Sequence, residues 1–317
     1  MKTASKTRLF FTTDVHGSEK TFRKFVSAGK FYKADVLILG GDLTGKLIIP
    51  IVKQTDGRHT ATFLGEERVV KNEQELADLE TLIRFSGFYP YQTDPDEVRE
   101  LSCDDVKMDE LFRRLITESM GRWIKLCEEH LSGSGIKCFI QGGNDDRREV
   151  SEILDNSDYV VNPEGKVVWI DEHHEMISTG HANITPFDCP GDIPEGELAK
   201  KIDEMASKVE NMKNCIFNFH CPPHGCGLDL APKLDKTLKP VFPPEEISVG
   251  STSVLKAVET YQPLLGLHGH IHESRGAIRI GRTLCINPGS EYGEGILRGV
   301  IIDLKKNDVA SYLLTSG

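Results

Sequence analysis

The segment LHGHIHE, residues 267–273, places histidines at positions 268, 270 and 272, at the end of an apolar run that begins at Pro263. This run has the length and apolar character of a buried strand. Because every second residue of a strand points to the same face, the three imidazoles are expected on one side of the sheet. Buried imidazoles need polar partners, so their role depends on whether other parts of the chain supply them.

Composition disfavours several broad classes of protein. The 317 residues are enough for one large domain or two ordinary ones, and 38 basic against 49 acidic residues give a net charge of -11. This charge disfavours broad attraction to nucleic acid or to an anionic membrane. No apolar run reaches the roughly 18 residues that span a bilayer. The beginning, MKTASKTRLFFTTDVHG, passes from a polar lead into a strand without a signal-peptide core, which predicts a cytoplasmic protein.

The eight cysteines are scattered, several of them in apolar runs, which indicates reduced buried thiols rather than a disulfide framework. Cys221 and Cys226, in HCPPHGC, could suggest a zinc site. No second cysteine pair at zinc-finger spacing accompanies them, so a structural zinc is not favoured.

Short apolar runs that end in polar or glycine-rich turns recur along the chain and predict buried strands. Helical patterns lie between several of them, among them residues 198–212 and residues 254–261, which Pro263 stops. The predicted fold class is therefore layered α/β. After residue 275 two hairpins are expected, with turns at Gly281 and at residues 306–308, so part of the sheet, or of a pair of sheets, is antiparallel.

Residues 46–135 do not follow this alternation of short strands and helices. They predict a hairpin, a helix around residues 73–86 and a long helix at about residues 105–131, between two strands that one crossover helix would otherwise join. The segment is therefore predicted to be an inserted subdomain within a single domain of residues 1–317. Such excursions often overhang the binding crevice, so a substrate cap and a packing subdomain are both open interpretations.

Residues that can bind metal ions follow the predicted strands. In an α/β protein such strand ends can converge on one crevice. A carboxylate between two divalent cations, several imidazoles and an amide oxygen form a suitable ligand set. Each residue alone is more often part of a turn or of a hydrogen-bonded core, but their joint order favours a metal site. The seven candidates are Asp14, His16, Asp42, Asn144, His220, His270 and His272.

Short motifs at these strand ends resemble the signature of the calcineurin-like metallophosphoesterases: DVH (14–16), GGD (40–42), GGND (142–145), NFH (218–220) and GHIH (269–272). Longer stretches, at 179–192, 220–229 and 263–290, look like the Icc-type phosphoesterase branch of that superfamily. The likeness spans essentially the whole chain outside the insertion. It implies a four-layer α/β/β/α sandwich of two mixed β-sheets with a dinuclear metal centre.

The resemblance also implies which residues bind which ion. One metal would be bound by Asp14, His16, Asp42 and His272, and the other by Asp42, Asn144, His220 and His270. On a strand, His270 and His272 would share a face and reach different ions of a pair about 3.5 to 4 Å apart. His268 lies deeper in the apolar run and is expected to be a hydrogen-bonded residue of the core. Manganese is the expected metal, with iron, zinc or nickel as alternatives.

The sequence departs from this signature directly after Asn144. Many members have a histidine there, which stabilises the transition state or protonates the leaving oxygen, whereas this chain has Asp145. In-line attack on phosphorus by a hydroxide that bridges two metal ions tolerates this loss. Some relatives without the histidine look like phosphodiesterases, so the resemblance implies a phosphodiesterase rather than a monoesterase.

Other residues could act on the substrate. Asp145 and His181 are candidates for proton transfer, although nearby divalent cations would lower the pKa of Asp145 and so favour His181 or water. Arg147, Arg275 and His224 are candidates for contacting the substrate. A structural or solvated loop position is an equal interpretation for His181 and His224, and a surface ion pair is an equal one for either arginine.

The predicted function is a metallophosphoesterase that acts on a small phosphate ester. Rival interpretations are a phosphomonoesterase or protein phosphatase, a nuclease, and a catalytically silent scaffold of the same fold. The full donor set argues against a scaffold, and the net charge of -11 without a basic stripe argues mildly against a nuclease. The physiological substrate, the native metal pair and the oligomeric state, a homo-oligomer included, stay open.

Overall fold

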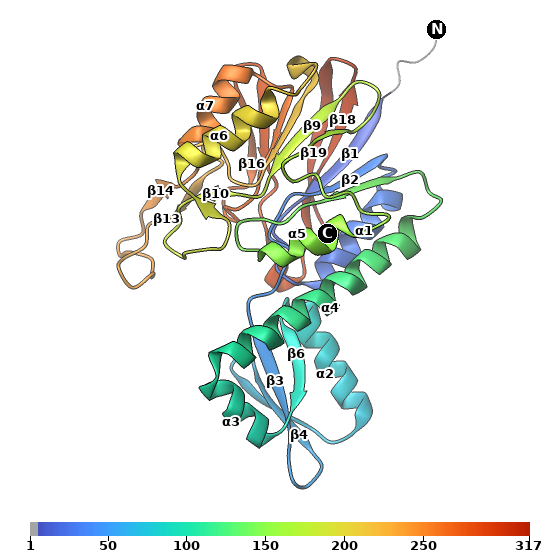
Figure 1. Cartoon of the computed structure of the whole chain (residues 1–317), viewed down its shortest axis with the longest axis vertical. Coiled ribbons are helices and arrows are strands. Elements are labelled where there is room, and N and C mark those ends of the chain that lie inside the picture. The colour runs from blue at the N-terminus through green and yellow to red at the C-terminus, as the bar shows by residue number, and fades with distance from the viewer. Residues whose placement is uncertain (1–5) are drawn as a thin grey trace.

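The computed structural model describes residues 6–317 and shows two β-sheets packed face to face, with helices on both outer faces (Figure 1). The first sheet has the strand order β19-β18-β1-β2-β7. Its β1, β2 and β7 are parallel, whereas β18 pairs antiparallel with both of its neighbours, β1 and β19. The strands are β1 (Thr7–Thr12), β2 (Val36–Leu39), β7 (Lys137–Ile140), β18 (Arg298–Lys305) and β19 (Asp308–Ser316).

The second sheet has the order β16-β17-β15-β12-β9-β8. Its four central strands are parallel, and both edge strands, β8 and β16, pair antiparallel with their neighbours. The strands are β8 (Val167–Trp169), β9 (Glu175–Thr179), β12 (Ile216–Phe219), β15 (Leu265–Leu267), β16 (Gly276–Ile280) and β17 (Thr283–Asn287). The β16–β17 and β18–β19 hairpins confirm the antiparallel units predicted after residue 275.

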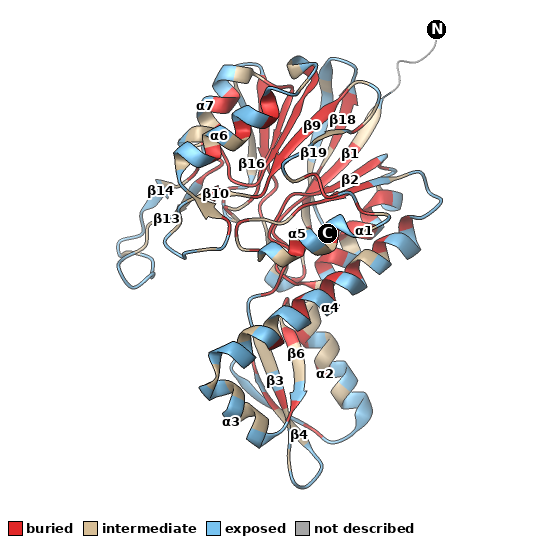
Figure 2. Ribbon diagram, in the orientation of Figure 1, coloured by how far each residue is buried: buried red, intermediate tan, exposed pale blue. Residues whose placement is uncertain are grey.

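The parallel strands of the first sheet are buried on both faces, because alternate side chains enter different hydrophobic cores. Phe10 of β1 and Leu37 of β2 pack against the outer helices, whereas Phe11 and Ile38 pack between the two sheets. A third core lies between the second sheet and its own helices. Figure 2 shows central strands such as β2 and β9 as buried. Three stacked cores require four layers, so the predicted α/β/β/α sandwich of two mixed sheets is confirmed.

Five helices form the outer layers. They are α1 (Glu19–Phe31), α4 (Asp105–Leu131) and α5 (Arg148–Asp155) on the first sheet, and α6 (Glu195–Ala206) and α7 (Thr252–Tyr261) on the second. Helix α7 begins after Ser251, whose hydroxyl accepts from the backbone of Val254, and it ends before Pro263 as predicted. Among residues 6–317, none of the helices combines the length and the apolar character needed to cross a bilayer.

Helix α6 is shorter than its sequence pattern. The pattern predicts a helix that continues to Met212, but α6 ends at Ala206 and a short 3₁₀ turn, η1 (Met212–Asn214), follows. The Glu175 carboxylate accepts hydrogen bonds from the backbone of Glu210 and Asn211, which satisfies these amides outside a helix. Met212 still packs in the core beneath α6, which explains why it fits the helical period.

A separate lobe lies between β2 and β7 in the sequence and below the two sheets in Figure 1. Its own sheet has the order β5-β4-β3-β6 and encloses a small core around Phe63 and Ile83. We call residues 48–103 the insertion lobe. Its elements are β3 (Ile48–Lys53), β4 (His59–Phe63), β5 (Glu66–Val70), α2 (Glu73–Phe85), β6 (Tyr89–Thr93) and α3 (Pro95–Cys103).

Helix α4 belongs to both parts of the molecule. It runs from the insertion lobe to the outer layer of the first sheet (Figure 1), where Trp123 stacks on Phe22 of α1 with ring centroids 4.0 Å apart. The predicted insertion covers residues 46–135, but only its first part projects from the sandwich. The later part of α4 is the crossover helix between β2 and β7.

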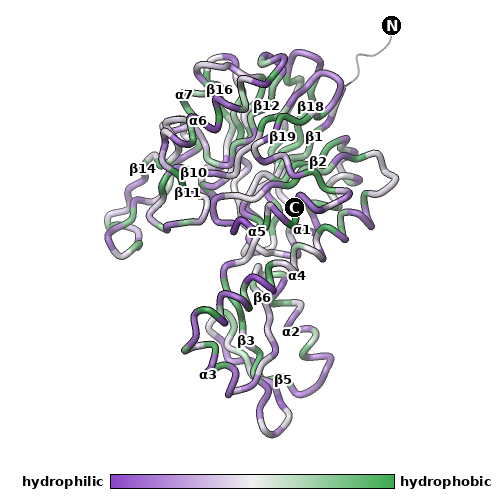
Figure 3. The backbone as a smooth tube through the Cα atoms, in the orientation of Figure 1, coloured by the Kyte–Doolittle hydropathy of each residue, from purple (hydrophilic) through white to green (hydrophobic). Residues whose placement is uncertain are grey.

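Short elements complete the fold. They are the two-stranded ribbons β10 (Ala182–Asn183) with β11 (Asp192–Ile193) and β13 (Leu230–Pro232) with β14 (Glu246–Ser248), and the 3₁₀ turn η2 (Tyr292–Glu294). Figure 3 shows hydrophobic residues concentrated along central strands such as β1 and β2. The cysteines in the described residues are free thiols, as predicted.

Glycines allow the insertion lobe to pack backbone to backbone against the loop after β1. A Cβ atom added to Gly45 would lie 2.2 Å from the Gly87 carbonyl oxygen, and one added to Gly87 would lie 2.4 Å from the His16 carbonyl oxygen. The amide of Gly45 also donates to the Tyr89 hydroxyl at 3.0 Å. The lobe therefore adjoins the strand-end loops in fixed register.

We expect Gly45→Ala to lower the free energy of unfolding by about 1–3 kcal/mol, because the new methyl group must displace the Gly87 carbonyl. Gly121→Ala is the matched control, since Gly121 lies in α4 with open space around its Cβ position, and it should stabilise by about 0.5–1 kcal/mol. Urea unfolding measures both variants. Equal urea midpoints for Gly45→Ala and the parent would show that the contact is dispensable.

Candidate metal centre

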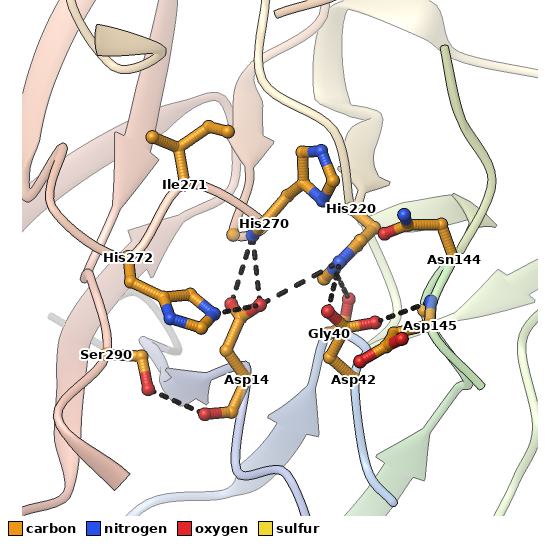
Figure 4. A network of polar contacts seen from close by, with 12 residues as sticks. Asp14, Gly40, Asp42, Asn144, Asp145, His220, His270, Ile271, His272 and Ser290 are labelled. Atoms are coloured by element: carbon orange, nitrogen blue, oxygen red, sulfur yellow. Dashed lines mark hydrogen bonds and ion pairs between the residues drawn. The ribbon is translucent and has the colours of Figure 1, made fainter. Parts of the chain in front are cut away.

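Seven donor side chains meet where strands of both sheets end (Figure 4). They come from loops that are distant in sequence but adjacent in the sandwich, since the parallel strands of both sheets end on the same side. Asp14 and His16 follow β1, Asp42 follows β2, Asn144 follows β7, His220 follows β12, and His270 and His272 follow β15. All are buried except His270 and His272, which are partly exposed.

The Asp and His side chains form two groups that share Asp42. Asp14, His16, Asp42 and His272 form one group and Asp42, His220 and His270 the other, and within each group the candidate ligand atoms lie within 4.8 Å of one another. The Oδ2 atom of Asp42 is 3.6 Å from Nε2 of His16 and 3.4 Å from Nε2 of His220. One carboxylate thus faces an imidazole of each group, which suits a ligand placed between two cations.

The segment that contains His270 and His272 is a loop rather than a strand. Strand β15 ends at Leu267, and His270 has a left-handed backbone with φ of 67°. The expected strand geometry is therefore wrong, and it is the turn at His270 that directs the two imidazoles to different groups. His268 is fully buried, with Nδ1 2.8 Å from the Phe219 carbonyl oxygen, as expected for a hydrogen-bonded residue of the core.

Strained backbone concentrates at these residues. Asp14, His16 and Asp42 have φ values of 54°, 38° and 51°, in the left-handed region that side chains other than glycine disfavour. Hydrogen bonds between loops hold this conformation, since the amides of Asp14 and His16 donate to the carbonyls of Gly41 and Asp42 at 2.9 Å. Strain of about 1–3 kcal/mol at each residue indicates a functional site.

The glycines of the motifs make room for the donors. A Cβ atom on Gly143 would lie 2.1 Å from Oδ1 of Asp42, and one on Gly269 would lie 2.4 Å from Oδ2 of Asp14. A Cβ atom on Gly41 would lie 2.5 Å from the His220 ring. Each glycine is therefore required by close approach of a donor from another loop.

Two donors have one polar atom fixed by the protein and the other unpaired. Nδ1 of His220 is 3.1 Å from the Gly40 carbonyl oxygen, and the Asn144 amide donates to Asp192 at 2.8 Å. The opposite atoms, Nε2 of His220 and Oδ1 of Asn144, are buried without a hydrogen-bond partner. Buried unpaired acceptors are costly unless they bind a ligand, so this arrangement fits divalent cations.

The protonation states of Asp14, His16 and His270 fit cation binding. Burial raises the pKa of Asp14, but the neighbouring His220 and His272 outweigh it and lower that pKa to about 2. Burial lowers the pKa of both His16 and His270 to about 4. The carboxylate is thus ionised and these imidazoles are neutral at pH 7, the forms that bind metals. Burial opposes the charge of His220, but the Asp42 and Asp14 carboxylates outweigh it and raise the pKa of His220 to about 10, so this imidazole must release a proton when it binds a cation. With mixed nitrogen and oxygen donors the residues could hold manganese, iron, zinc or nickel.

Asp146 connects the loop after β2 to the loop after β7 through hydrogen bonds. Its carboxylate accepts hydrogen bonds from the amides of Leu43, Thr44 and Gly143 at 2.8–2.9 Å and from the Thr44 hydroxyl at 2.6 Å. Burial and the nearby Asp42 carboxylate raise the pKa of Asp146 to about 6. This residue positions the loops of Asp42 and Asn144 and does not enter either donor group.

Of the two residues predicted to transfer protons, Asp145 contacts a donor directly, and His181 is linked to Asn144 through the backbone of Gly191. The backbone amide of Asp145 donates to Oδ1 of Asp42, and its Oδ2 atom lies 2.5 Å from Nζ of Lys46. His181 is half-buried, with Nδ1 3.0 Å from the carbonyl oxygen of Gly191, whose amide donates to the backbone of Asn144. His181 thus belongs to the loop that supports Asn144.

The predicted substrate contacts have other partners. The Arg147 guanidinium pairs with Asp109 at 2.5 Å and lies over the Phe112 ring, so it packs on α4. Arg275 is exposed and donates to the backbone of Thr315 in β19. His224 is exposed, with Nδ1 3.8 Å from the Asp229 carboxylate. These contacts give each of the three side chains a partner within the protein, and their contact with substrate stays a prediction.

Several residues of the site escape analysis of the sequence alone. Lys46 pairs with Asp145, Asp192 holds Asn144, and the Tyr292 ring lies 4.6 Å from the His16 ring. Lys46 follows GGDLTG closely and Tyr292 follows INPGS closely, so nearness to a motif is the only signal that could have found them.

Comparison with known proteins places the chain next to an archaeal relative. No family model matches the chain. The uncharacterized protein MJ1162 of Methanocaldococcus jannaschii is 32% identical over 169 residues, which cover 53% of this chain and 67% of that protein. The chain belongs to the family of MJ1162.

Solved structures show a likeness in fold. TT1561 of Thermus thermophilus matches 99% of both chains at 14% identity, with a TM-score of 0.53. YfcE, a phosphoesterase from E. coli, is aligned over 96% of this chain and 98% of its own at 10% identity, with a TM-score of 0.34. At 14% identity the likeness to TT1561 concerns the fold alone, so function must be argued from the donor groups.

We expect Asp42→Asn to reduce bound manganese from about two ions per chain to one or none, because an amide cannot supply the charge that both donor groups share. Metal analysis after reconstitution measures the content, and urea unfolding checks that the fold survives. Asp158→Asn, which alters an exposed carboxylate, is the control and should keep the parental content. Two ions per chain in Asp42→Asn would contradict the shared role of Asp42.

Proposed function

We propose that the chain is a metal-dependent phosphohydrolase that cleaves phosphoric diesters through a dinuclear centre. The observation that carries this proposal is the pair of buried donor groups that share Asp42. The unpaired acceptor atoms of Asn144 and His220 support it, because they face the same space as the shared carboxylate (Figure 4).

The bound cations would neutralise the charge of the phosphoryl oxygens and activate water for attack on phosphorus. The chain's own residues prepare this site. Asp42 and Asp14 place two negative charges in a buried space. Their burial would be costly without cations to neutralise them. The strand-end loops fix the donors before substrate arrives, so little reorganisation is needed on binding.

The residues around the donors determine which esters suit the site. Asp145 stands beside Asn144, so no imidazole at that position protonates the leaving oxygen. Substrates with good leaving groups are therefore favoured, and His181 or solvent is the proton source that we propose. Asp145 also adds a carboxylate that repels dianionic monoesters more than monoanionic diesters. Lys46 offsets much of this charge, so the resulting preference is modest.

The insertion lobe is proposed to form one wall of the approach to the donors. Its contact with the site runs through Gly87, which packs on the backbone of His16, one of the seven donors. A wall at this place would limit bulky esters rather than change metal binding.

A substrate screen tests the proposed activity directly. The manganese-loaded protein is assayed with an aryl monoester, the matching aryl diester and a cyclic nucleotide, and the diester should be cleaved fastest. The Asp42→Asn variant controls for contaminating activity. Turnover of none of these esters by a fully loaded protein would favour the silent scaffold, and a clear preference for the monoester would favour a phosphomonoesterase.

We expect Asp145→His to raise the ratio of monoesterase to diesterase activity by about tenfold, which corresponds to about 1.4 kcal/mol. The substitution removes a carboxylate from the approach to phosphorus and supplies an imidazole next to Asn144. Initial rates on the aryl monoester and the aryl diester measure the ratio. Asp188→His, in an exposed turn, is the control. An unchanged ratio would disprove the electrostatic argument for diester preference.

We expect His181→Ala to slow poor leaving groups by about tenfold or more while good leaving groups change little, because only the former need a proton in the transition state. A series of aryl diesters with leaving groups of increasing pKa measures the slope of rate against pKa. The control is His224→Ala, whose imidazole is exposed. The same slope in His181→Ala and the parent would leave solvent as the proton source.

A further inference from the structure

Lys46 is a cationic side chain that reaches the edge of the two donor groups through Asp145. Its Nζ atom is 2.5 Å from Oδ2 of Asp145, and that same oxygen is 3.5 Å from Nδ1 of His16. The backbone amide of Asp145 in turn donates to Asp42. A chain of polar contacts therefore joins Lys46 to the residue that both donor groups share.

The backbone before Lys46 is fixed by tight packing, whereas the Lys46 side chain is partly exposed to solvent. Gly45, directly before it, donates to the Tyr89 hydroxyl and packs against Gly87 without room for a Cβ atom. The Lys46 side chain is 55% exposed, whereas that of Asp145 is 21% exposed. The ammonium group therefore extends from a fixed point at the entry to the insertion lobe and can change partners without disturbing the fold.

The ion pair itself gives little stability. The Lys46 side chain is more than half exposed, so water screens the pair and the long side chain loses freedom on pairing, although Oδ2 of Asp145 is itself buried. A pair at the rim of a buried anionic centre must have another consequence. It holds a positive charge next to the donors at a place where a phosphate ester would carry its negative oxygens.

We propose that Lys46 is a substrate-binding residue, whose ammonium group leaves Asp145 and pairs with the non-bridging oxygens of the phosphate ester. Asp145 is then a positioning residue, which keeps Lys46 at the rim until an anion competes for it. This inference rests on the proposed function, since it assumes that a phosphate group lies over the two donor groups. No covalent step and no proton transfer by Lys46 is involved.

The Tyr292 ring lies beside the donor group of His16 and His272. Its ring centroid lies 4.6 Å from that of His16 and 5.9 Å from that of His272, so it covers one side of this donor group. Tyr292 and Asp145 both lie against His16, so they flank this donor group where Lys46 reaches it.

The test is calorimetric titration of the manganese-loaded protein with inorganic phosphate. We expect Lys46→Met to weaken phosphate binding by at least about tenfold, since a charge-assisted hydrogen bond is lost, with manganese content unchanged. Lys46→Arg keeps the charge and should bind within about threefold of the parent. Lys53→Met removes an exposed lysine at the end of β3 and should bind phosphate like the parent.

Variants of Asp145 test whether its carboxylate competes with phosphate for Lys46. If it competes with phosphate for Lys46, Asp145→Ala should tighten phosphate binding in the parent but not in the Lys46→Met background. A lysine with a merely structural role predicts no such coupling. Parental affinity in Lys46→Met, weaker binding by Asp145→Ala in both backgrounds, loss of manganese in Lys46→Met, or no phosphate binding by the parent would each overturn the inference.

The outcome separates this inference from the proposed function. Phosphate binding that depends on Lys46, in a protein that hydrolyses none of the tested esters, would retain the inference and reject the phosphohydrolase. If the Lys46→Met variant hydrolyses esters with the parental KM and binds phosphate with the parental affinity, the phosphohydrolase is retained and Lys46 is rejected as a substrate contact.

Discussion

The burial of two carboxylates beside four imidazoles is the constraint on which the rest of the site depends. Asp14 and Asp42 are almost completely buried, and isolated charges in such surroundings cost several kcal/mol. The left-handed backbone at the donors and the glycines without room for a Cβ atom are what this crowding requires. A structure that accepts strain at several donor residues has a use for their close approach, and binding of cations is the use that the unpaired atoms of His220 and Asn144 indicate.

The sequence predicted the chemistry of the site better than its shape. Donor identity is a local property, so the residues at the ends of apolar runs could be named. The apolar runs predicted a layered α/β fold, and the four layers were implied by the resemblance to the metallophosphoesterases. The turn at His270 could not be predicted, because alternate spacing of histidines is equally compatible with a strand and with a loop whose backbone has positive φ. For the same reason the partners of Arg147 escaped prediction, since Asp109 lies on a helix that no motif connects to it.

Helix α4 shows a second limit of patterns in sequence. Its 3.6-residue period predicts a helix over residues 105–131, and the structure has it at Asp105–Leu131. The period does not say what each part of the apolar face packs against. Trp123 packs on α1 of the sandwich, so a helix assigned to the insertion is also the crossover between β2 and β7. An insertion that shares a helix with the sheet layer is not an independent unit, and its contact at Gly45 and Gly87 brings it to the donor loops.

The exchange of a histidine for Asp145 is best understood together with Lys46. Burial opposes the charge of the lysine, but the Asp145 carboxylate outweighs it and raises the pKa of Lys46. A lysine that stays protonated at pH 7 supplies charge without supplying a proton, whereas an imidazole could supply both. The pair of Lys46 and Asp145 therefore keeps positive charge at the rim of the donor groups while giving up acid catalysis there. In the proposed phosphohydrolase such a site would depend on the leaving group, because the charge of the phosphoryl oxygens would be neutralised but the departing oxygen would have to obtain its proton elsewhere.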